Sequence, residues 1–152
     1  GLYLLQQDAD VAEGTAILVK DDYPKLTNLQ DIAAPFIYIS TKQELDKLKQ
    51  GINDKKKFDK TVLEITKDRD RARELMRNYF RRVTLANACF TSFKEGWKTD
   101  RGMVYMIYGK PQSVIKSAEK EVWNYDSMSF TFMLSRTLFD PDNFVLVRNK
   151  KY

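Results

Sequence analysis

Gly96-Trp97-Lys98-Thr99-Asp100-Arg101-Gly102 separates two parts of the chain whose apolar residues follow different periods. Before this stretch, apolar side chains recur at the 3,4 spacing of a helix face, and they predict one long helix over about 68–93. After it, short apolar or alternating runs predict β-strands over 103–108, 121–126, 130–134 and 144–148. Helices followed by strands indicate an α+β fold. Since the strands are joined by short connections, we expect an antiparallel sheet of three to five strands.

The residues before the long helix predict shorter elements. Runs at 2–6 and 15–20 are typical of short strands, with a polar turn between them. Thr41 and Glu44 have the spacing of a capping box, which predicts a helix from there to about Gln50. A second short helix is expected over 54–65. The N-terminal part therefore combines strands and helices.

The glycines and the tryptophan of residues 96–102 suggest how the two parts are joined. Gly96 is expected to take the left-handed conformation that ends a helix. Trp97 is expected to bury its ring at the junction of helix and sheet. Gly102 is expected to let the backbone enter the first strand. These expectations assign the stretch a structural role.

The polar residues of the stretch have two interpretations. Thr99 or Asp100 can accept backbone N–H groups in a tight turn, and Arg101 can pair with Asp100 or another nearby carboxylate. The alternative is that the stretch is a binding site. Its candidate binding residues are then Trp97, Lys98, Thr99, Asp100 and Arg101.

The composition excludes several kinds of chemistry. The 152 residues include no histidine and one cysteine. Ser-His-Asp and Cys-His catalysis are therefore excluded, as are almost all zinc and non-haem iron sites, and we expect no metal and no cofactor. No apolar run approaches the roughly 18 residues of a membrane helix, so no membrane span is expected. Cys89 lies near the apolar face of the long helix and is predicted to be buried.

Basic residues are concentrated in the middle of the chain. Residues 1–40 carry 2 basic and 6 acidic groups, whereas residues 41–82 carry 14 basic and 8 acidic groups. Acids interleave the basic residues, which favours a solvated helix face with i,i+4 pairs. The alternative is a surface that binds anionic polymers. We expect no nucleic acid, because the basic residues lie on helices, away from the aromatic strands.

Carboxylates and aromatic residues leave two further alternatives. Glu95 with Asp100, or Glu121 with Asp126, could act as a general acid and base, for example on glycans. Against this, Glu121 and Asp126 are expected to point to opposite faces of their strand. An aromatic set could form a wet binding face for glycan or peptide, although a core role is favoured. Its members are Trp97, Tyr105, Tyr108, Trp123 and Tyr125.

Residues 96–102 and the sequences on both sides of them resemble a known family. Gly96-Trp97-Lys98-Thr99-Asp100 resembles the signature of the bacterial GWxTD domain family. The resemblance extends from about residue 15 to the end of the chain. It includes the flanking stretches Phe90-Thr91-Ser92-Phe93, Tyr108-Gly109-Lys110-Pro111, Glu121-Val122-Trp123-Asn124-Tyr125 and Asn143-Phe144-Val145-Leu146.

The resemblance implies a setting but no reaction, because the activity of the family is not established. It implies that residues 1–152 form a single domain of a longer bacterial protein that is secreted or held in the cell envelope. A chain that begins at Gly1 with no signal-peptide pattern is also expected to be excised from a longer one. The location implied is the periplasm, the outer membrane or the cell surface. The leading expectation is a non-catalytic interaction or structural module whose partner is an envelope protein or a glycan.

Overall fold

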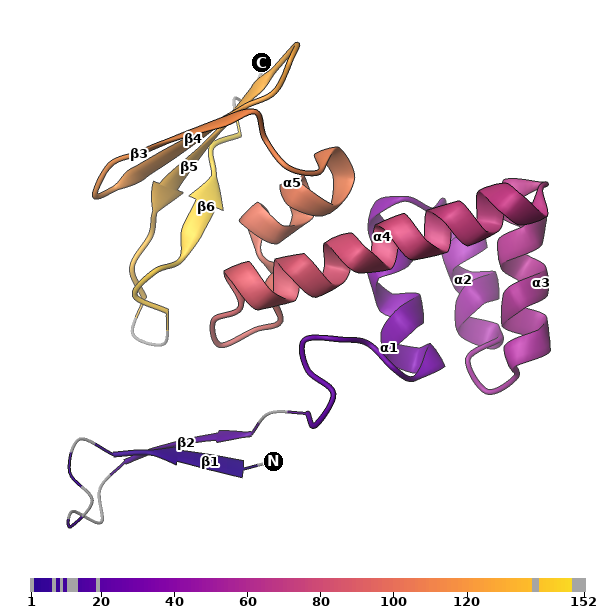
Figure 1. The fold of residues 1–152 in the computed structure, drawn as a ribbon, viewed down its shortest axis with the longest axis horizontal. Helices are drawn as coiled ribbons and strands as arrows, with labels where there is room; N and C mark the ends of the chain where they lie inside the picture. The colour runs from indigo at the N-terminus through magenta and orange to yellow at the C-terminus, as the bar shows by residue number, and fades with distance from the viewer. Residues whose placement is uncertain are drawn as a thin grey trace.

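The chain folds as α+β, as the sequence predicts. A computed structural model describes residues 2–6, 8, 10, 14–18, 20–137 and 140–148. A hairpin of β1 (Leu2–Leu5) and β2 (Thr15–Leu18) comes first, and helices then precede the remaining strands (Figure 1). The helices are α1 (Leu29–Ala33), η1 (Ala34–Tyr38), α2 (Lys42–Gln50), α3 (Lys55–Thr66), α4 (Arg69–Phe90), η2 (Gly96–Lys98) and α5 (Asp100–Tyr108). The later strands are β3 (Ser113–Lys116), β4 (Lys120–Asn124), β5 (Ser129–Leu134) and β6 (Phe144–Leu146).

Helix α4 links the two halves of the fold. Helices α1 to α3 lie around its N-terminal half, and α5 lies beside its C-terminal half, between α4 and the four-stranded sheet (Figure 1). The core follows the same order in three clusters. Phe36, Leu48 and Phe58 pack near the start of α4, whereas Trp123 and Phe132 pack under the sheet. The middle cluster contains Tyr79, Val83, Ala86, Trp97 and Met106.

Local signals place the helices where the sequence predicts them. Thr41 accepts a hydrogen bond from the Glu44 amide while the Glu44 carboxylate accepts one from the Thr41 amide, so the predicted capping box is formed. Asp68 caps α4 by accepting from the Arg71 amide at 2.8 Å. The long helix ends at Phe90, three residues before the predicted end at 93.

The sheet is an antiparallel meander, as predicted, with strand order β3-β4-β5-β6. Glu121 is paired with Phe132, and Trp123 with Phe130, across β4 and β5. Because alternate residues point to opposite faces, these four side chains share the face that covers α5. Strand β3 was not predicted, since all four of its residues are exposed and show no apolar alternation. It pairs with β4 from Ser113 to Lys116.

Residues 103–108 form a helix, so the predicted first strand is wrong. They belong to α5, which begins at Asp100. Helix α5 is buried on two sides: Met106 packs with the middle cluster on α4, and Val104 packs with Trp123 under the sheet. A short helix buried on both sides loses the polar face that reveals helical periodicity, and its apolar run then resembles a strand. Gly102 correspondingly lies inside this helix instead of at the entry to a strand.

Cys89 is exposed, which contradicts the predicted core position. At this level of α4, Ala86 and Asn87 face the interior and Phe90 packs against the third cluster. Cys89 lies beside this face. One residue corresponds to about 100° around a helix, so an error of one position in placing the apolar stripe is enough to misplace such a residue.

Tyrosines with a raised pKa make the stability of the fold sensitive to alkaline pH. Burial raises the pKa of Tyr125 to about 12 and also raises the pKa of Tyr79, whose hydroxyl donates to the Pro35 carbonyl at 2.6 Å. Both rings stay protonated in the folded chain at a pH where the unfolded chain loses these protons. The free energy of unfolding should therefore fall as pH rises from about 10 towards 12.

Urea unfolding at pH values between about 9 and 11 tests this expectation. Tyr79→Phe removes one of the tyrosines with a raised pKa, so the variant should lose less stability over this interval than the wild type, although it starts lower because a hydrogen bond is missing. Equal losses in the two proteins would show that Tyr79 does not contribute.

Candidate functional site

Two glycines bring three backbone segments into direct contact at the signature. A Cβ atom on Gly96 would lie 2.0 Å from the Ala86 carbonyl oxygen of α4, and one on Gly102 would lie 1.9 Å from the Gly96 carbonyl oxygen. The expected left-handed conformation of Gly96 is wrong, because the described residues with positive φ are Lys67 and Gly109. Gly96 is required by close approach instead. The signature thus stacks η2 on α4 and α5 on η2.

Trp97 is buried, as predicted, but on the helical side of the junction. Its side chain is 6% exposed and packs with the middle cluster on α4. The Tyr38 ring meets it edge-on with centroids 6.0 Å apart, and the Tyr38 hydroxyl donates to the Trp97 carbonyl at 3.2 Å. The indole N–H donates to Glu95 at 3.1 Å. Both the ring and the polar groups of Trp97 are therefore used inside the fold.

Thr99 and Asp100 are also used inside the fold. Thr99 caps α5: its hydroxyl accepts from the Gly102 amide at 3.0 Å and donates to the Gly96 carbonyl at 2.7 Å. The Asp100 carboxylate accepts from the Leu146 amide at 2.8 Å. One residue starts the helix, and the other ties that start to strand β6.

Lys98 occupies the variable position of the signature and is the one that faces solvent. Its side chain is 48% exposed and pairs with Glu95 at 2.7 Å. The ammonium group also lies over the Trp97 ring, 5.1 Å from its centroid. An exposed ion pair of this kind contributes little to stability.

Arg101 joins α5 to the sheet. Its guanidinium group donates to Glu121 at 3.2 Å and to the Asp142 carbonyl at 3.2 Å. It lies over the rings of Phe90 and Phe144, whose centroids are 5.5 and 4.5 Å away. The expected carboxylate partner of Arg101 is thus Glu121, which is 4% exposed. This buried pair links α5 to strand β4.

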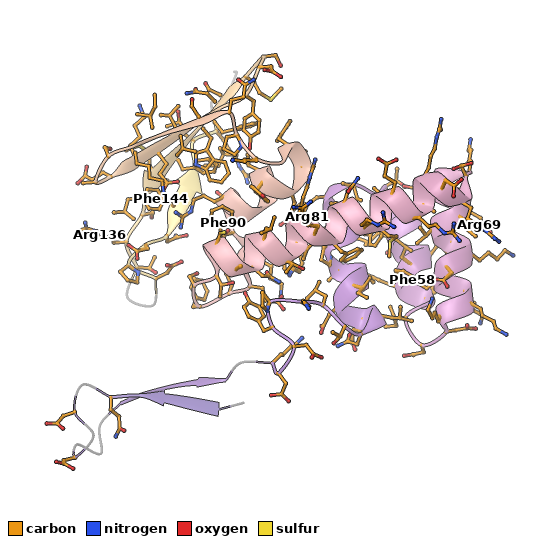
Figure 2. All side chains as sticks on the ribbon, in the orientation of Figure 1. Phe58, Arg69, Arg81, Phe90, Arg136 and Phe144 are labelled. Atoms are coloured by element: carbon orange, nitrogen blue, oxygen red, sulfur yellow. The ribbon has the colours of Figure 1, made fainter. Side chains whose placement is uncertain are left out.

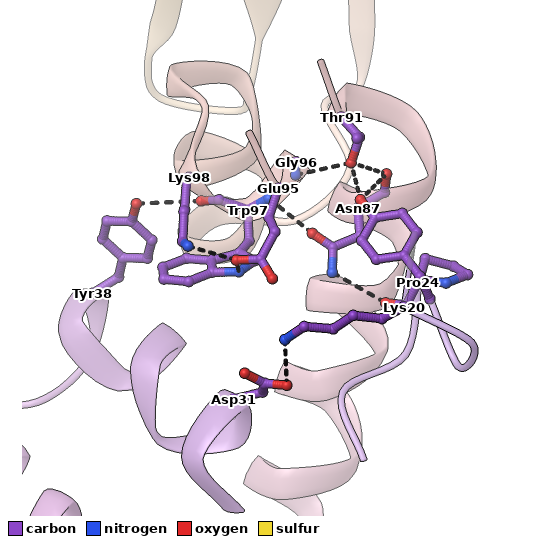
Figure 3. Close-up of polar contacts among 11 residues, drawn as sticks. Lys20, Pro24, Asp31, Tyr38, Asn87, Thr91, Glu95, Gly96, Trp97 and Lys98 are labelled. Atoms are coloured by element: carbon purple, nitrogen blue, oxygen red, sulfur yellow. Dashed lines mark hydrogen bonds and ion pairs between the residues drawn. The ribbon is translucent and has the colours of Figure 1, made fainter. Parts of the chain in front are cut away.

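Asn87 is a central residue of this network that the sequence analysis missed. It is 1% exposed on α4. Its side-chain oxygen accepts from the Trp97 amide at 3.2 Å, and its side-chain nitrogen donates to the Pro24 carbonyl at 3.1 Å (Figure 3). Asn87 therefore connects the signature to the loop that precedes α1. The available signal was an amide side chain on the inward face of an otherwise apolar stripe.

Other bonds fasten the same loop. The Tyr23 hydroxyl donates to the Asn87 carbonyl and is hydrogen-bonded to Thr91, whose hydroxyl accepts from the Gly96 amide. Lys20 pairs with Asp31 at 2.6 Å (Figure 3). This hydrogen bond lowers the pKa of the Asp31 carboxyl and raises that of Lys20.

Replacing Asn87 with alanine should cost about 2–3 kcal/mol of stability, because the Trp97 amide is left buried without a partner. Asn78 on the same helix is exposed and supplies the matched control. Asn78→Ala should stay within about 0.5 kcal/mol of the wild type. Urea unfolding followed by circular dichroism measures both. Similar effects of the two changes would contradict the role assigned to Asn87.

Comparison with known proteins identifies the signature. A family model, the GWxTD domain, matches residues 1–152, the whole chain. The chain belongs to the GWxTD domain family. No curated protein and no solved structure matches it. In this GWxTD domain, the four residues that the family name spells out each contact the protein interior or its backbone: Gly96, Trp97, Thr99 and Asp100. Lys98, at the variable position, is exposed.

Each carboxylate of the candidate acid–base pairs in the GWxTD domain is bonded to another group of the protein. Glu95 bonds to Lys98 and to the Trp97 indole, whereas Asp100 bonds to β6. Glu121 bonds to Arg101 and to the Trp123 indole, and Asp126 bonds to Gln112. Each of these carboxylates therefore contacts a different structural group.

The aromatic set of the GWxTD domain lies largely in the core. Trp97 and Trp123 are buried, and Tyr105 packs against the middle and third clusters. Tyr108 is 43% exposed and lies against Phe130, with ring centroids 4.8 Å apart. The two tryptophans therefore do not form a solvent-exposed binding face.

The described part of the GWxTD domain shows neither a cluster of metal ligands nor a membrane-spanning helix. No three His, Cys, Asp or Glu side chains among the described residues gather where they could hold a metal ion. Within the same residues, no helix has both the length and the apolar character needed to cross a membrane.

Proposed function

We propose that the domain is a non-catalytic interaction or structural module of a longer bacterial protein that is secreted or held in the cell envelope. The observation that carries the proposal is the internal use of the signature. Gly96, Trp97, Thr99 and Asp100 all contact the protein itself. When the signature residues serve to fold the domain, the property that members of the family share is the fold.

The carboxylates support the same proposal. A general acid and base must both reach one substrate. Here Glu121 is buried beneath the sheet against Arg101 and Trp123, and Asp100 is bonded to a backbone amide of β6. The arrangement favours structural roles for these acids over glycan hydrolysis. We also propose that the protein is exported to the periplasm, the outer membrane or the cell surface, because the family resemblance implies this location.

Turnover assays combined with binding assays test the proposed function. The protein is incubated with chromogenic glycosides, esters and phosphomonoesters, beside the variants Glu95→Gln and Glu121→Gln. We expect no product above the background without protein. Turnover that disappears in either variant would overturn the proposal. Saturable binding of a peptide or glycan without its conversion would support it.

A further inference from the structure

Helix α4 differs from its neighbours in the type of its basic residues. All six basic residues of α4 are arginine, whereas every basic residue of α2 and α3 is lysine. Arginine presents a planar fork that matches carboxylates in a two-point bond, and lysine presents a strongly hydrated point charge. The arginines of α4 therefore offer forked donors that the lysines of α2 and α3 do not.

Most of these arginines have no acidic partner. Arg82 donates to the Met106 and Ile107 carbonyls at 3.0 Å and thereby satisfies the end of α5. Arg73 meets Asp70 at 3.5 Å on the exposed surface. The remaining arginines of α4 form no ion pair within the described part of the chain: Arg69, Arg71, Arg77 and Arg81. Figure 2 labels Arg69 and Arg81 on this helix.

Three arginines border a groove in the angle between α3 and α4. The groove has a volume of about 650 Å³. Its floor is apolar and consists of Val62, Leu63, Ala72 and Met76, of which Leu63 is 36% exposed. Its rim carries Asp59, Arg69, Arg73 and Arg77.

The rim is positively charged and regularly spaced. Arg69, Arg73 and Arg77 follow one another at i,i+4, so each lies about 6 Å further along the axis of α4. Asp59, the one acid in the lining, is already bonded to Lys55 at 2.7 Å. The groove therefore combines an apolar floor with a row of cations that have no strong internal partner.

We propose that this groove binds a short acidic amphipathic helix of a partner protein, lying along α4. Carboxylates at i,i+4 on the partner would match the arginine row, and apolar side chains on its adjacent face would cover Leu63 and Met76. The inference rests on the proposed function, because it supplies the partner chemistry for an interaction module.

The floor of the groove distinguishes this partner from other anions. A polyphosphate chain would use the arginines but would leave the apolar floor uncovered, and a membrane presents a broad surface whereas this floor lies in the angle between two helices. A helix of acidic and apolar faces uses both features, and it buries side chains that are exposed without it. The geometry therefore favours a peptide helix.

Selection from a displayed peptide library tests the proposal. Random peptides of about 16 residues, enough for four helical turns, are selected on the whole chain and then measured by fluorescence anisotropy. We expect the selected peptides to carry Asp or Glu at i,i+4 beside an apolar i,i+3/i+4 face. Arg69→Glu combined with Arg73→Glu and Arg77→Glu should weaken their binding at least about tenfold, and added salt should weaken it as well.

Two further variants separate charge from shape. Lys110→Glu with Lys120→Glu and Arg136→Glu makes the same change of net charge on exposed residues of the sheet half, and it should leave binding within about twofold. Leu63→Ser keeps every charge and removes part of the floor, so it should weaken the peptides severalfold. Circular dichroism confirms that each variant is folded.

The proposal is overturned by several results. Selected peptides without acidic residues, equal binding to the groove variant and the sheet-half control, or no selected peptide would each do so. Equal binding of polyphosphate or of phosphatidylglycerol vesicles that is insensitive to Leu63→Ser would assign the groove to a polyanion or a membrane. Self-association of the chain that the arginine substitutions abolish would assign it to a second copy. Peptides that bind elsewhere contradict this inference alone, whereas carboxylate-dependent turnover contradicts the proposed function.

Discussion

Gly102→Ala is expected to destabilise the protein by at least about 3 kcal/mol, a large part of the stability of a domain of this size. In an ordinary helix the same change would stabilise by about 1 kcal/mol, because alanine is the better helix former. Here the added methyl group would lie 1.9 Å from the Gly96 carbonyl oxygen, which belongs to the backbone and cannot swing aside. The opposite sign of the effect is therefore diagnostic of the stacked backbone segments.

Equilibrium urea unfolding measures this difference, and Gly96→Ala should behave alike because its Cβ would lie 2.0 Å from the Ala86 carbonyl oxygen. Gln43→Ala, at an exposed position of α2, is the control and should stay within about 0.5 kcal/mol of the wild type. If Gly102→Ala were as stable as the wild type, α5 and η2 would not pack this closely.

Trp97→Ala is expected to cost about 3–5 kcal/mol, the loss typical of a buried aromatic side chain. The change empties the space among Tyr79, Val83 and Met106 and removes the edge contact with Tyr38. Urea unfolding followed by far-ultraviolet circular dichroism measures the cost. A loss of this size means that the signature acts in folding.

Phe93→Ala is the matched control for Trp97→Ala, since Phe93 is an aromatic side chain that is 65% exposed. It should change the free energy of unfolding by less than about 0.5 kcal/mol. A Trp97→Ala variant that is equally stable would contradict the burial of Trp97, and the signature would then become the binding surface to study.

Local sequence signals were sufficient for much of the fold. The capping box at Thr41, the apolar stripe of α4 and the alternation around Trp123 each depend on residues close in sequence, and each predicted the correct element. The family signature was also legible, because it is a contiguous stretch. The structural interpretation of Thr99 and Arg101 followed from their hydrogen-bonding groups, although their partners did not.

The wrong prediction for residues 103–108 arises because both sides of α5 are covered. Met103–Tyr108 has apolar residues facing α4 and others facing the sheet, so no polar face marks it as a helix. The roles of Gly96 and Gly102 were also not predictable. The sequence shows that both lack a side chain, but it does not show which backbone atoms pack against them. Strand β3 is exposed throughout and carries no apolar alternation.

By itself, the sequence determined the α+β class, the long helix, the meander and the family, because these follow from local periodicity, capping groups and a contiguous signature. The tertiary structure alone decided that Asn87 joins the signature to the loop at Pro24, that Glu121 is the partner of Arg101, and that arginines of α4 border an apolar groove. Each of these joins residues far apart in the chain or depends on which helix face is covered. Such contacts are set by how the elements pack, and the pattern within any one element does not contain them.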